Sequence, residues 1–343
     1  MSEPFRVGLT RDLLSSSGIP SFGAGPLTLL DACPALQWEF IEDDVGEITP
    51  DLVARYDALY VNAPRVTAAS IGRADRRAMI VARHGVGYDS VDVPALTRAG
   101  IVVTNTPIAI RRPVATMAIT FVLALAQRLF EKDRLTRAGG WTRRTDYMGQ
   151  GLTGKVLGIV GAGGTGRETI KLAKPFELEV LAADPYADPA EVAAMGAHLV
   201  SLDELLARSD FVVLTCLLDD STRHMIDARR LAAMKRTAYL VNVARGPVVD
   251  ELALIQALRE GALAGAALDV FEQEPVAPDN PLLAMSNVIV TPHSLCWTDE
   301  CFDAIARAGL GSIVDFALHR APRSVVDRKA LEHPAVRAWL AGA

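Results

Sequence analysis

The sequence predicts an α/β protein of two domains, each built on a doubly wound parallel sheet. Short, strongly apolar runs alternate along the chain with segments whose apolar residues have helical spacing. A glycine-rich turn at 158–166 is joined to an acidic residue, Asp184, through one strand–helix–strand unit. That unit begins only near residue 152 of 343, so the long segment before it is expected to form a domain of its own.

The apolar runs are the expected strands. Each is short and rich in aliphatic or β-branched residues, and the segments between them are long enough for helices. Parallel strands need such helical crossovers, which is why the alternation favours parallel sheets. The expected strands are residues 5–10, 58–62, 101–104, 156–160, 180–183, 211–215, 238–243, 265–270 and 288–290.

A helix that is apolar on nearly all faces is expected at 113–129. Its large apolar residues, such as Met117 and Phe121, recur with helical spacing, and smaller ones fill the other faces. A helix of this kind is buried between domains or in an interface. The segment after it, 134–150, is polar, and we expect its Trp141 to serve packing rather than chemistry.

The glycine-rich unit is typical of dinucleotide binding. Gly161 lets the chain turn tightly off the strand, Gly163 lets the backbone approach a pyrophosphate, and Gly166 lets the next helix pack close to the sheet. The phosphates then meet free N–H groups at the start of that helix. Asp184 has the spacing of an acceptor for the adenosine ribose hydroxyls, and its charge would repel a 2′-phosphate. We therefore expect NAD rather than NADP.

Composition excludes several kinds of partner. The formal net charge is −6 and no run of Lys and Arg is present, so no nucleic-acid partner is expected. The N-terminus does not resemble a secretion signal and the longest apolar stretch is too short to span a bilayer, which predicts a soluble cytoplasmic protein with no membrane partner. The spacing of the cysteines fits neither a zinc site nor a disulfide framework, so no metal site is expected. They are Cys33, Cys216, Cys296 and Cys301.

Polar side chains follow several expected strands in the second half of the chain, at the sheet edge where α/β proteins bind ligands. Arg245 has a planar guanidinium that can hold a carboxylate through two hydrogen bonds. His293 can give and take a proton near neutrality, and a carboxylate such as Glu274 would orient its ring. Asp269 is a candidate acceptor for the nicotinamide carboxamide. Taken singly, each also fits an ordinary structural or solvated loop residue.

Six motifs occur in a specific order along the chain. They are GVGYDSVD at 85–92, TNTP at 104–107 and LTGK at 152–155, followed after the glycine-rich turn by VNVARG at 241–246, DVFEQEP at 269–275 and TPH at 291–293. Jointly they resemble the D-isomer-specific 2-hydroxyacid dehydrogenases, over roughly residues 5–325.

The resemblance implies a two-domain architecture and an activity. An NAD-binding Rossmann domain, 108–294, would be inserted into a discontinuous, flavodoxin-like substrate-binding domain made of 1–107 and 295–343. The enzyme would interconvert a small D-2-hydroxy acid and its 2-oxo acid in the crevice between the domains. His293 would be the general acid/base and Glu274 its carboxylate partner.

The remaining site residues also follow from the resemblance. Arg245 would bind the substrate carboxylate and carbonyl, and the N–H groups of Val86 and Gly87 would hold the carboxylate from the opposite side. A homodimer formed through the NAD domains is implied, with 134–150 as a candidate arm. The residues expected at the cofactor are Gly161, Gly163, Gly164, Thr165, Gly166, Asp184, Cys216 and Asp269.

Some positions depart from the family pattern. Trp297 adds bulk after the histidine, and we expect it to wall the substrate pocket. His84 stands where a small residue is common; it would either read the distal group of the substrate or be a structural histidine. The pair Gly164-Thr165 replaces larger residues, Thr116 replaces a frequent glutamate, and Cys216 begins a loop that lacks the usual proline. These changes bear on affinity and substrate choice rather than on reaction type.

The sequence supports one leading function and one alternative. The leading function is NAD-dependent reduction or oxidation of a small 2-oxo or D-2-hydroxy acid, with glyoxylate and hydroxypyruvate among the possible substrates. The alternative is an NAD(H)-sensing protein, like the transcriptional corepressors that share this fold. Such corepressors can retain the Arg, Glu and His set, so turnover of a 2-oxo acid separates the two.

Overall fold

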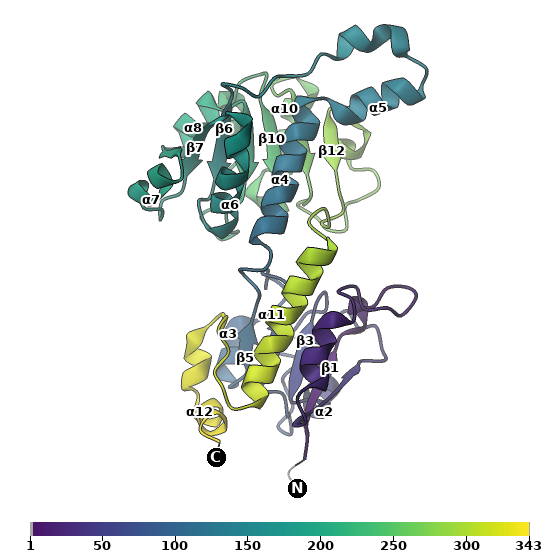
Figure 1. The fold of residues 1–343 in the computed structure, drawn as a ribbon, viewed down its shortest axis with the longest axis vertical. Coiled ribbons are helices and arrows are strands. Elements are labelled where there is room, and N and C mark those ends of the chain that lie inside the picture. The colour runs from purple at the N-terminus through teal and green to yellow at the C-terminus, as the bar shows by residue number, and fades with distance from the viewer. Residues whose placement is uncertain (1–2, 343) are drawn as a thin grey trace. The chain divides into compact units, whose positions relative to one another are not determined.

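The structure is a computed structural model that describes residues 3–342. It divides into two compact units (Figure 1). Unit 1 comprises the chain up to Ile110 and again from Trp297, and unit 2 is Arg111–Cys296. The boundaries expected from the sequence, at 107/108 and 294/295, differ from these by two or three residues.

Unit 1 contains a parallel sheet of five strands in the order β2-β1-β3-β4-β5. Both faces of the sheet are covered. In β3, Ala58 and Tyr60 belong to one apolar cluster and Leu59 and Val61 to another, because side chains alternate across a strand. The strands are β1 (Phe5–Leu9), β2 (Leu36–Phe40), β3 (Ala58–Val61), β4 (Ile80–Arg83) and β5 (Val102–Thr104).

Helices from both ends of the chain complete unit 1. Helix α11 (Asp299–Ala317) packs on the face that β1 shares with Tyr60, so the last part of the chain contributes to the core begun by the first. This packing explains why the chain after residue 296 needs no core of its own. The helices are α1 (Thr28–Asp31), α2 (Pro50–Arg55), α3 (Val93–Arg98), α11 (Asp299–Ala317) and α12 (Pro334–Leu340).

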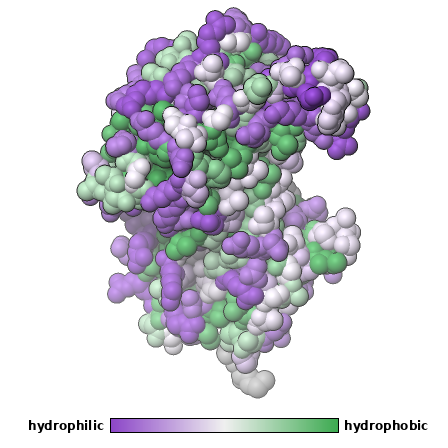
Figure 2. Space-filling model, turned by 45° about the horizontal axis from the view of Figure 1, so that its top comes forward, coloured by the Kyte–Doolittle hydropathy of each residue, from purple (hydrophilic) through white to green (hydrophobic). Residues whose placement is uncertain are grey.

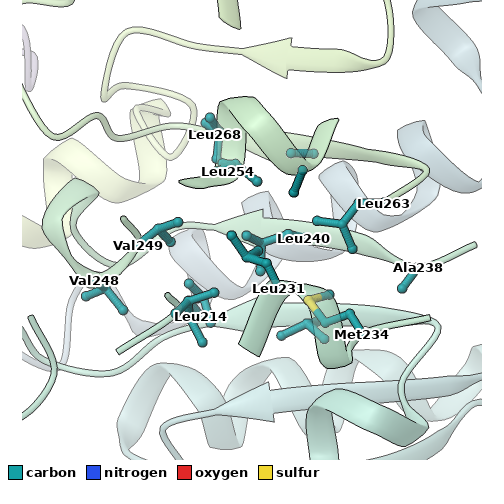
Figure 3. Close-up of a cluster of buried hydrophobic side chains, with 14 of the residues drawn as sticks. Leu214, Leu231, Met234, Ala238, Leu240, Val248, Val249, Leu254, Leu263 and Leu268 are labelled. Carbon is teal, nitrogen blue, oxygen red and sulfur yellow. The ribbon is translucent and has the colours of Figure 1, made fainter. Parts of the chain in front are cut away.

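Unit 2 contains a parallel sheet of seven strands in the order β12-β11-β10-β9-β6-β7-β8. Apart from Asn242 at the end of β10, its central strands are apolar, and their side chains meet those of the helices in a buried layer (Figure 3). The strands are β6 (Val156–Val160), β7 (Glu179–Ala183), β8 (Ala197–Leu199), β9 (Phe211–Leu214), β10 (Tyr239–Asn242), β11 (Gly265–Leu268) and β12 (Val288–Val290). The helices are α4 (Arg111–Ala126), α5 (Leu129–Arg137), α6 (Gly164–Ala173), α7 (Pro189–Ala194), α8 (Leu202–Arg208), α9 (Ala228–Ala233) and α10 (Glu251–Arg259).

The α/β class with two parallel sheets agrees with the sequence prediction, but three strands were not foreseen. These are β2, β4 and β8. In β2 only the first residue is buried, so the strand lacks a continuous apolar run, as an edge strand can. Strand β8 is short and lies at the other sheet's edge, so its pairing depends on its neighbour. Strand β4 has a buried apolar run at 80–82 that was overlooked in the sequence.

The expected apolar helix is α4, which is buried on nearly all sides and packs against α6, β10 and β11 (Figure 1). The segment after it is different. Helix α5 and the 3-10 helix η3 (Trp141–Tyr147) have no buried residue, and the expectation that Trp141 packs is wrong within this chain, because its side chain is 66% exposed. Hydrophilic residues are spread over both units on the face drawn in Figure 2, with hydrophobic ones scattered among them.

Within the described residues, no single helix combines the length and apolar character needed to cross a membrane. The consecutive helices α4 and α5, bent by 55° at their junction, meet the length and composition criteria only as a pair. Most of α4 is buried inside the protein.

Candidate active site

The glycine-rich turn leaves β6 and enters α6 with little room for side chains. Gly161 has a φ of 95°, and a Cβ there would lie 2.7 Å from the backbone of Cys216 at the end of the neighbouring strand. A Cβ on Gly166 would overlap the carbonyl oxygen of Gly161, whereas one on Gly163 would meet only open space. Gly161 and Gly166 are therefore required by packing, and Gly163 leaves the backbone accessible from outside.

The first turn of α6 offers donors to an anion. Gly163 caps the helix without a side-chain hydrogen bond. Among the described residues, no acceptor is found for the N–H groups of Gly164, Thr165 and Gly166. Such N–H groups at the positive end of a helix dipole form an anion site, and the glycines let a phosphate approach them.

Asp184 stands at the end of β7, beside this turn. One of its carboxylate oxygens accepts from the N–H of Ala162 and the other from the N–H of Tyr186, each at 2.8 Å. These bonds orient the carboxylate and leave further lone pairs on both oxygens. Cys216 lies across the turn, and burial raises the pKa of its thiol to about 11, so it is a neutral, largely apolar contact.

Arg245 follows β10 in a loop that is shaped by a buried side chain. The amide of Asn242, only 1% exposed, donates to the carbonyl of Arg245 at 3.0 Å and accepts from the N–H of Ala244. A Cβ on Gly246 would overlap the backbone of Phe271 and Glu272. Gly246 thus lets the Arg245 loop lie directly against the loop that carries Glu274. The sequence motifs contained Asn242 and Gly246, but these roles were not foreseen.

His293 and Glu274 form a hydrogen-bonded pair. Nδ1 of His293 donates to Oε2 of Glu274 at 2.7 Å, and the N–H of Phe271 donates to the other carboxylate oxygen at 3.0 Å. The two side chains are 46% and 37% exposed. Because Nδ1 is engaged, the ring can exchange a proton with a ligand only through Nε2.

The pair shifts the protonation of both groups. The hydrogen bond to Glu274 raises the pKa of His293 above its ordinary value, although burial and the charge of Arg245 act in the opposite direction. Burial is the largest influence on Glu274 and acts to raise its pKa, but the hydrogen bonds from His293 and Phe271 and the positive charge of Arg245 outweigh it and leave that pKa lowered. The glutamate therefore remains ionised while the histidine titrates, and Arg245 lies close enough to influence both.

Asp269 connects β11 to the His293 loop. It is 1% exposed, and its Oδ1 accepts from Thr291 Oγ1 at 2.5 Å and from the N–H groups of Ser294 and Leu295, both at 3.1 Å. These bonds fix the backbone on both sides of His293. Within the described chain, no hydrogen bond reaches Oδ2, which is the oxygen left to accept one from a ligand.

A second histidine–glutamate pair, not foreseen from the sequence, occurs in unit 2. Nε2 of His224 lies 2.6 Å from Oε1 of Glu272, and these side chains are 43% and 34% exposed. His224 and His293 also share a left-handed backbone, with φ of 50° and 53°. The two pairs are similar in length, exposure and backbone conformation, but His224 bonds through Nε2 and His293 through Nδ1.

In unit 1, the loop after β4 has its carbonyl groups occupied. The carbonyl of His84 accepts from Arg83 Nη1, that of Gly85 from the N–H of Thr106 at 3.0 Å, and that of Val86 from Asn105 Nδ2 at 2.8 Å. Among the described residues, the N–H groups of Val86 and Gly87 have no acceptor. The loop therefore has free donors held in place by its carbonyl bonds. Asn105 belongs to the quoted TNTP motif, but its contact with Val86 was not foreseen.

The two departures from the family pattern in unit 1 lie in one aromatic cluster. His84 is 4% exposed, its Nδ1 lies 2.5 Å from the hydroxyl of Tyr60, and burial lowers its pKa to about 3, so the ring is neutral. Phe302 packs between His84 and Trp297, at ring-centroid distances of 5.0 and 5.1 Å. Trp297 is 57% exposed. Contact of His84 with a substrate would require its ring to be uncovered, whereas Trp297 is accessible.

Within the described residues, no group of three or more His, Cys, Asp or Glu side chains is arranged to hold a metal ion. The four cysteines, all among the described residues, are not joined in disulfides; Cys33 and Cys301 are buried, and Cys216 and Cys296 are half-buried.

Comparison with known proteins assigns the chain to a family. Residues 119–294 match the profile of the D-isomer specific 2-hydroxyacid dehydrogenase NAD binding domain. The glyoxylate reductase of Thermococcus onnurineus is 38% identical over 300 residues, which cover 86% of this chain and 90% of the relative. This chain belongs to the D-isomer specific 2-hydroxyacid dehydrogenase family. As a D-2-hydroxyacid dehydrogenase, it is an oxidoreductase with an NAD-binding Rossmann domain.

Two further proteins agree with this assignment, one of them named for a different substrate. The D-3-phosphoglycerate dehydrogenase of Archaeoglobus fulgidus is 36% identical over 83% of this dehydrogenase and 53% of the relative. The solved structure of a glyoxylate reductase from Paecilomyes thermophila superposes with a TM-score of 0.80 at 28% identity, covering 95% of this chain and all of that one.

The residues of the dehydrogenase fit the cofactor that its family binds. A Cβ would fill the turn at Gly161 and Gly166, the first N–H groups of α6 lack acceptors, and Asp184 keeps lone pairs beside them. These features accommodate a pyrophosphate and an adjacent ribose. They do not by themselves separate NAD from NADP.

Proposed function

We propose that this dehydrogenase reduces glyoxylate, or a similarly small 2-oxo acid, to the corresponding 2-hydroxy acid, which has the D configuration wherever C2 is a stereocentre. The observation that carries the proposal is the His293–Glu274 hydrogen bond in the same unit as the dinucleotide turn and within electrostatic reach of Arg245. The similarity to enzymes named glyoxylate reductase supports the choice of a small substrate.

Each of the three residues would have one task. Arg245 binds the carboxylate and polarises the carbonyl of the 2-oxo acid through its planar guanidinium. His293 donates a proton from Nε2 to the carbonyl oxygen as that oxygen becomes a hydroxyl, and Glu274 stabilises the imidazolium before the transfer. The bound nicotinamide supplies the hydride that C2 receives. In the oxidative direction His293 accepts the hydroxyl proton.

Unit 1 would supply the second carboxylate contact. The N–H groups of Val86 and Gly87 are suited to it because they lack acceptors while Asn105 and Thr106 hold the neighbouring carbonyls. We assign Trp297 to the wall of the substrate pocket, in keeping with its exposure. His84 would act on the substrate through the shape of this loop, since its ring faces Tyr60.

The proposed cofactor is NAD rather than NADP. Asp184 is held at the turn by two backbone hydrogen bonds, so its carboxylate would accept from the ribose hydroxyls and repel a 2′-phosphate. Asp269 would accept from the nicotinamide carboxamide through Oδ2.

The proposed assembly is a homodimer formed through unit 2. The segment from α5 through η3 has no buried residue and carries exposed apolar side chains. Several exposed large apolar side chains in one segment favour an interface. The exposed residues are Leu129, Phe130, Trp141 and Met148. Light scattering of the purified protein would test this, and a monomer would contradict it.

Turnover is the direct test of the proposed function. The protein is mixed with NADH and, in parallel, NADPH, against glyoxylate, hydroxypyruvate, pyruvate and bulkier 2-oxo acids, and loss of the reduced nicotinamide absorbance is followed. We expect the reduced cofactor to be oxidised when glyoxylate is present, and NADH to be oxidised in preference to NADPH. Binding of NADH without turnover of any 2-oxo acid would favour the NAD(H)-sensing alternative.

A further inference from the structure

Arg111 is the first residue of α4, which runs alongside α6 (Figure 1). Its side chain extends over the glycine-rich turn. A Cβ placed on Gly164 would overlap Arg111 Nε and would lie 2.7 Å from its Cδ and 2.9 Å from its Cζ. The guanidinium therefore occupies the space that any side chain at 164 would need, and only glycine at 164 admits it there.

Gly164 begins the turn of helix whose N–H groups lack acceptors. A guanidinium at this point lies beside the anion site of the proposed dinucleotide. The pyrophosphate of a dinucleotide carries two negative charges, and arginine binds phosphate oxygens through paired N–H donors.

Further basic side chains on α4 and α6 contact carboxylates. Arg112 lies 3.6 Å from Glu168, which also binds Lys171 at 2.6 Å. Arg167 binds Glu191 at 2.5 Å and donates to the carbonyl of Ala162 at 3.0 Å. Arg111 differs from them in position, because it is the basic side chain that lies directly over Gly164.

We propose that Arg111 binds the pyrophosphate of the dinucleotide and that Gly164 is small because it makes room for this arginine. The positive charge that binds the phosphates thus comes from a side chain of α4 and not from the glycine-rich turn. The inference rests on the proposed dinucleotide-dependent function. It also predicts that positions 111 and 164 are coupled, because a larger residue at 164 displaces the guanidinium.

The test compares two neighbouring arginines in the full-length protein. We would measure the dissociation constants of two ligands for wild type, Arg111→Gln and Arg112→Gln at low and high salt. One ligand is NADH, whose binding is followed by nicotinamide fluorescence. The other is ADP-ribose, which has the pyrophosphate but no nicotinamide. Arg111→Gln should weaken both ligands about tenfold at low salt and less at high salt, because a charged contact is lost and salt screens it. Arg112→Gln removes the same charge next to Glu168 and should change both by less than about twofold.

The coupling is tested by Gly164→Ala alone and together with Arg111→Gln. Gly164→Ala alone should bind ADP-ribose about as weakly as Arg111→Gln does. The double variant should bind it no more weakly than either single variant. If the Tm of Arg111→Gln shows that this variant is unstable, Arg111→Lys is used in its place. Because lysine keeps the charge, it should weaken the binding of both ligands by less than about tenfold. Equal affinities in Arg111→Gln and Arg112→Gln would overturn the proposal. Failure of the wild-type protein to bind NADH would instead overturn the proposed function on which it rests.

Discussion

Replacing His293 with alanine tests the proton transfer most directly. The substitution removes the imidazole that donates to Glu274 at 2.7 Å and leaves the glycine-rich turn unchanged. General acid–base catalysis contributes about 10²–10⁴-fold to a rate, so turnover of glyoxylate should fall by about that factor. NADH affinity should remain within about twofold of wild type, because the residues assigned to its pyrophosphate and ribose are untouched.

The structural effect of the same substitution should be small. With 46% and 37% of the two side chains exposed, solvent screens the pair, and such exposed pairs contribute about 0–1 kcal/mol to the free energy of unfolding. For a chain of this size that corresponds to a fall in Tm of at most about 2–4 °C. Loss of turnover should therefore greatly exceed loss of stability.

His224→Ala is the matched control. It breaks the His224–Glu272 pair, which has a similar length, exposure and backbone conformation. Its Tm should fall by a similar amount, and its turnover should stay within about threefold of wild type, because no catalytic role is assigned to this pair. Steady-state rates with saturating NADH and thermal melts are measured on both variants. Equal loss of turnover in the two, or retained turnover in His293→Ala, would refute the assignment of the proton donor.

The remaining predictions concern pH, cofactor choice and the turn. In Glu274→Gln the pKa of His293 should fall, because Glu274 raises it. Since reduction needs the imidazolium, the alkaline limb of the pH profile of kcat/KM should move to lower pH. If the limb does not move, it reports the titration of a group other than His293. Asp184→Ala should shift the kcat/KM ratio of NADPH to NADH upward by about tenfold, and an unchanged ratio would contradict its proposed role. Gly166→Ala should lower Tm because its Cβ overlaps Gly161. Gly163→Ala should leave Tm unchanged and weaken only the binding of NADH. Equal Tm values and equal NADH affinities in the two variants would contradict the packing argument.

Local pattern was sufficient wherever function depends on residues that are close in sequence. The order of strand, glycine-rich turn, helix and acid predicted the dinucleotide unit, because the conformation of Gly161 and the packing of Gly166 are needed within one short segment. Parallel sheets followed from the alternation of apolar runs with helices. Polar residues directly after strands, such as Arg245 and His293, were recognised because parallel strands end at a common edge.

Local pattern failed where pairing or exposure depends on distant segments. The strands β2 and β8 have too little apolar sequence to be recognised and are held at sheet edges by their neighbours. Trp141 is apolar and was expected to pack, but it lies in a segment with no buried residue. The orientation of His84 toward Tyr60 likewise depends on β3, which runs beside its own strand.

By itself, the sequence determined the α/β class, the dinucleotide turn and the identity of the polar residues at the strand ends. The family resemblance implied that Glu274 partners His293, and the tertiary structure supplied the geometry of that pair and the contacts that hold the other residues. His293 reaches Glu274 across 19 positions of the chain, Gly246 brings Arg245 against the Glu274 loop, and Arg111 lies over Gly164. The physical reason is that a hydrogen bond or close contact requires placement within a few tenths of an ångström, which only the packing of whole helices and strands can supply.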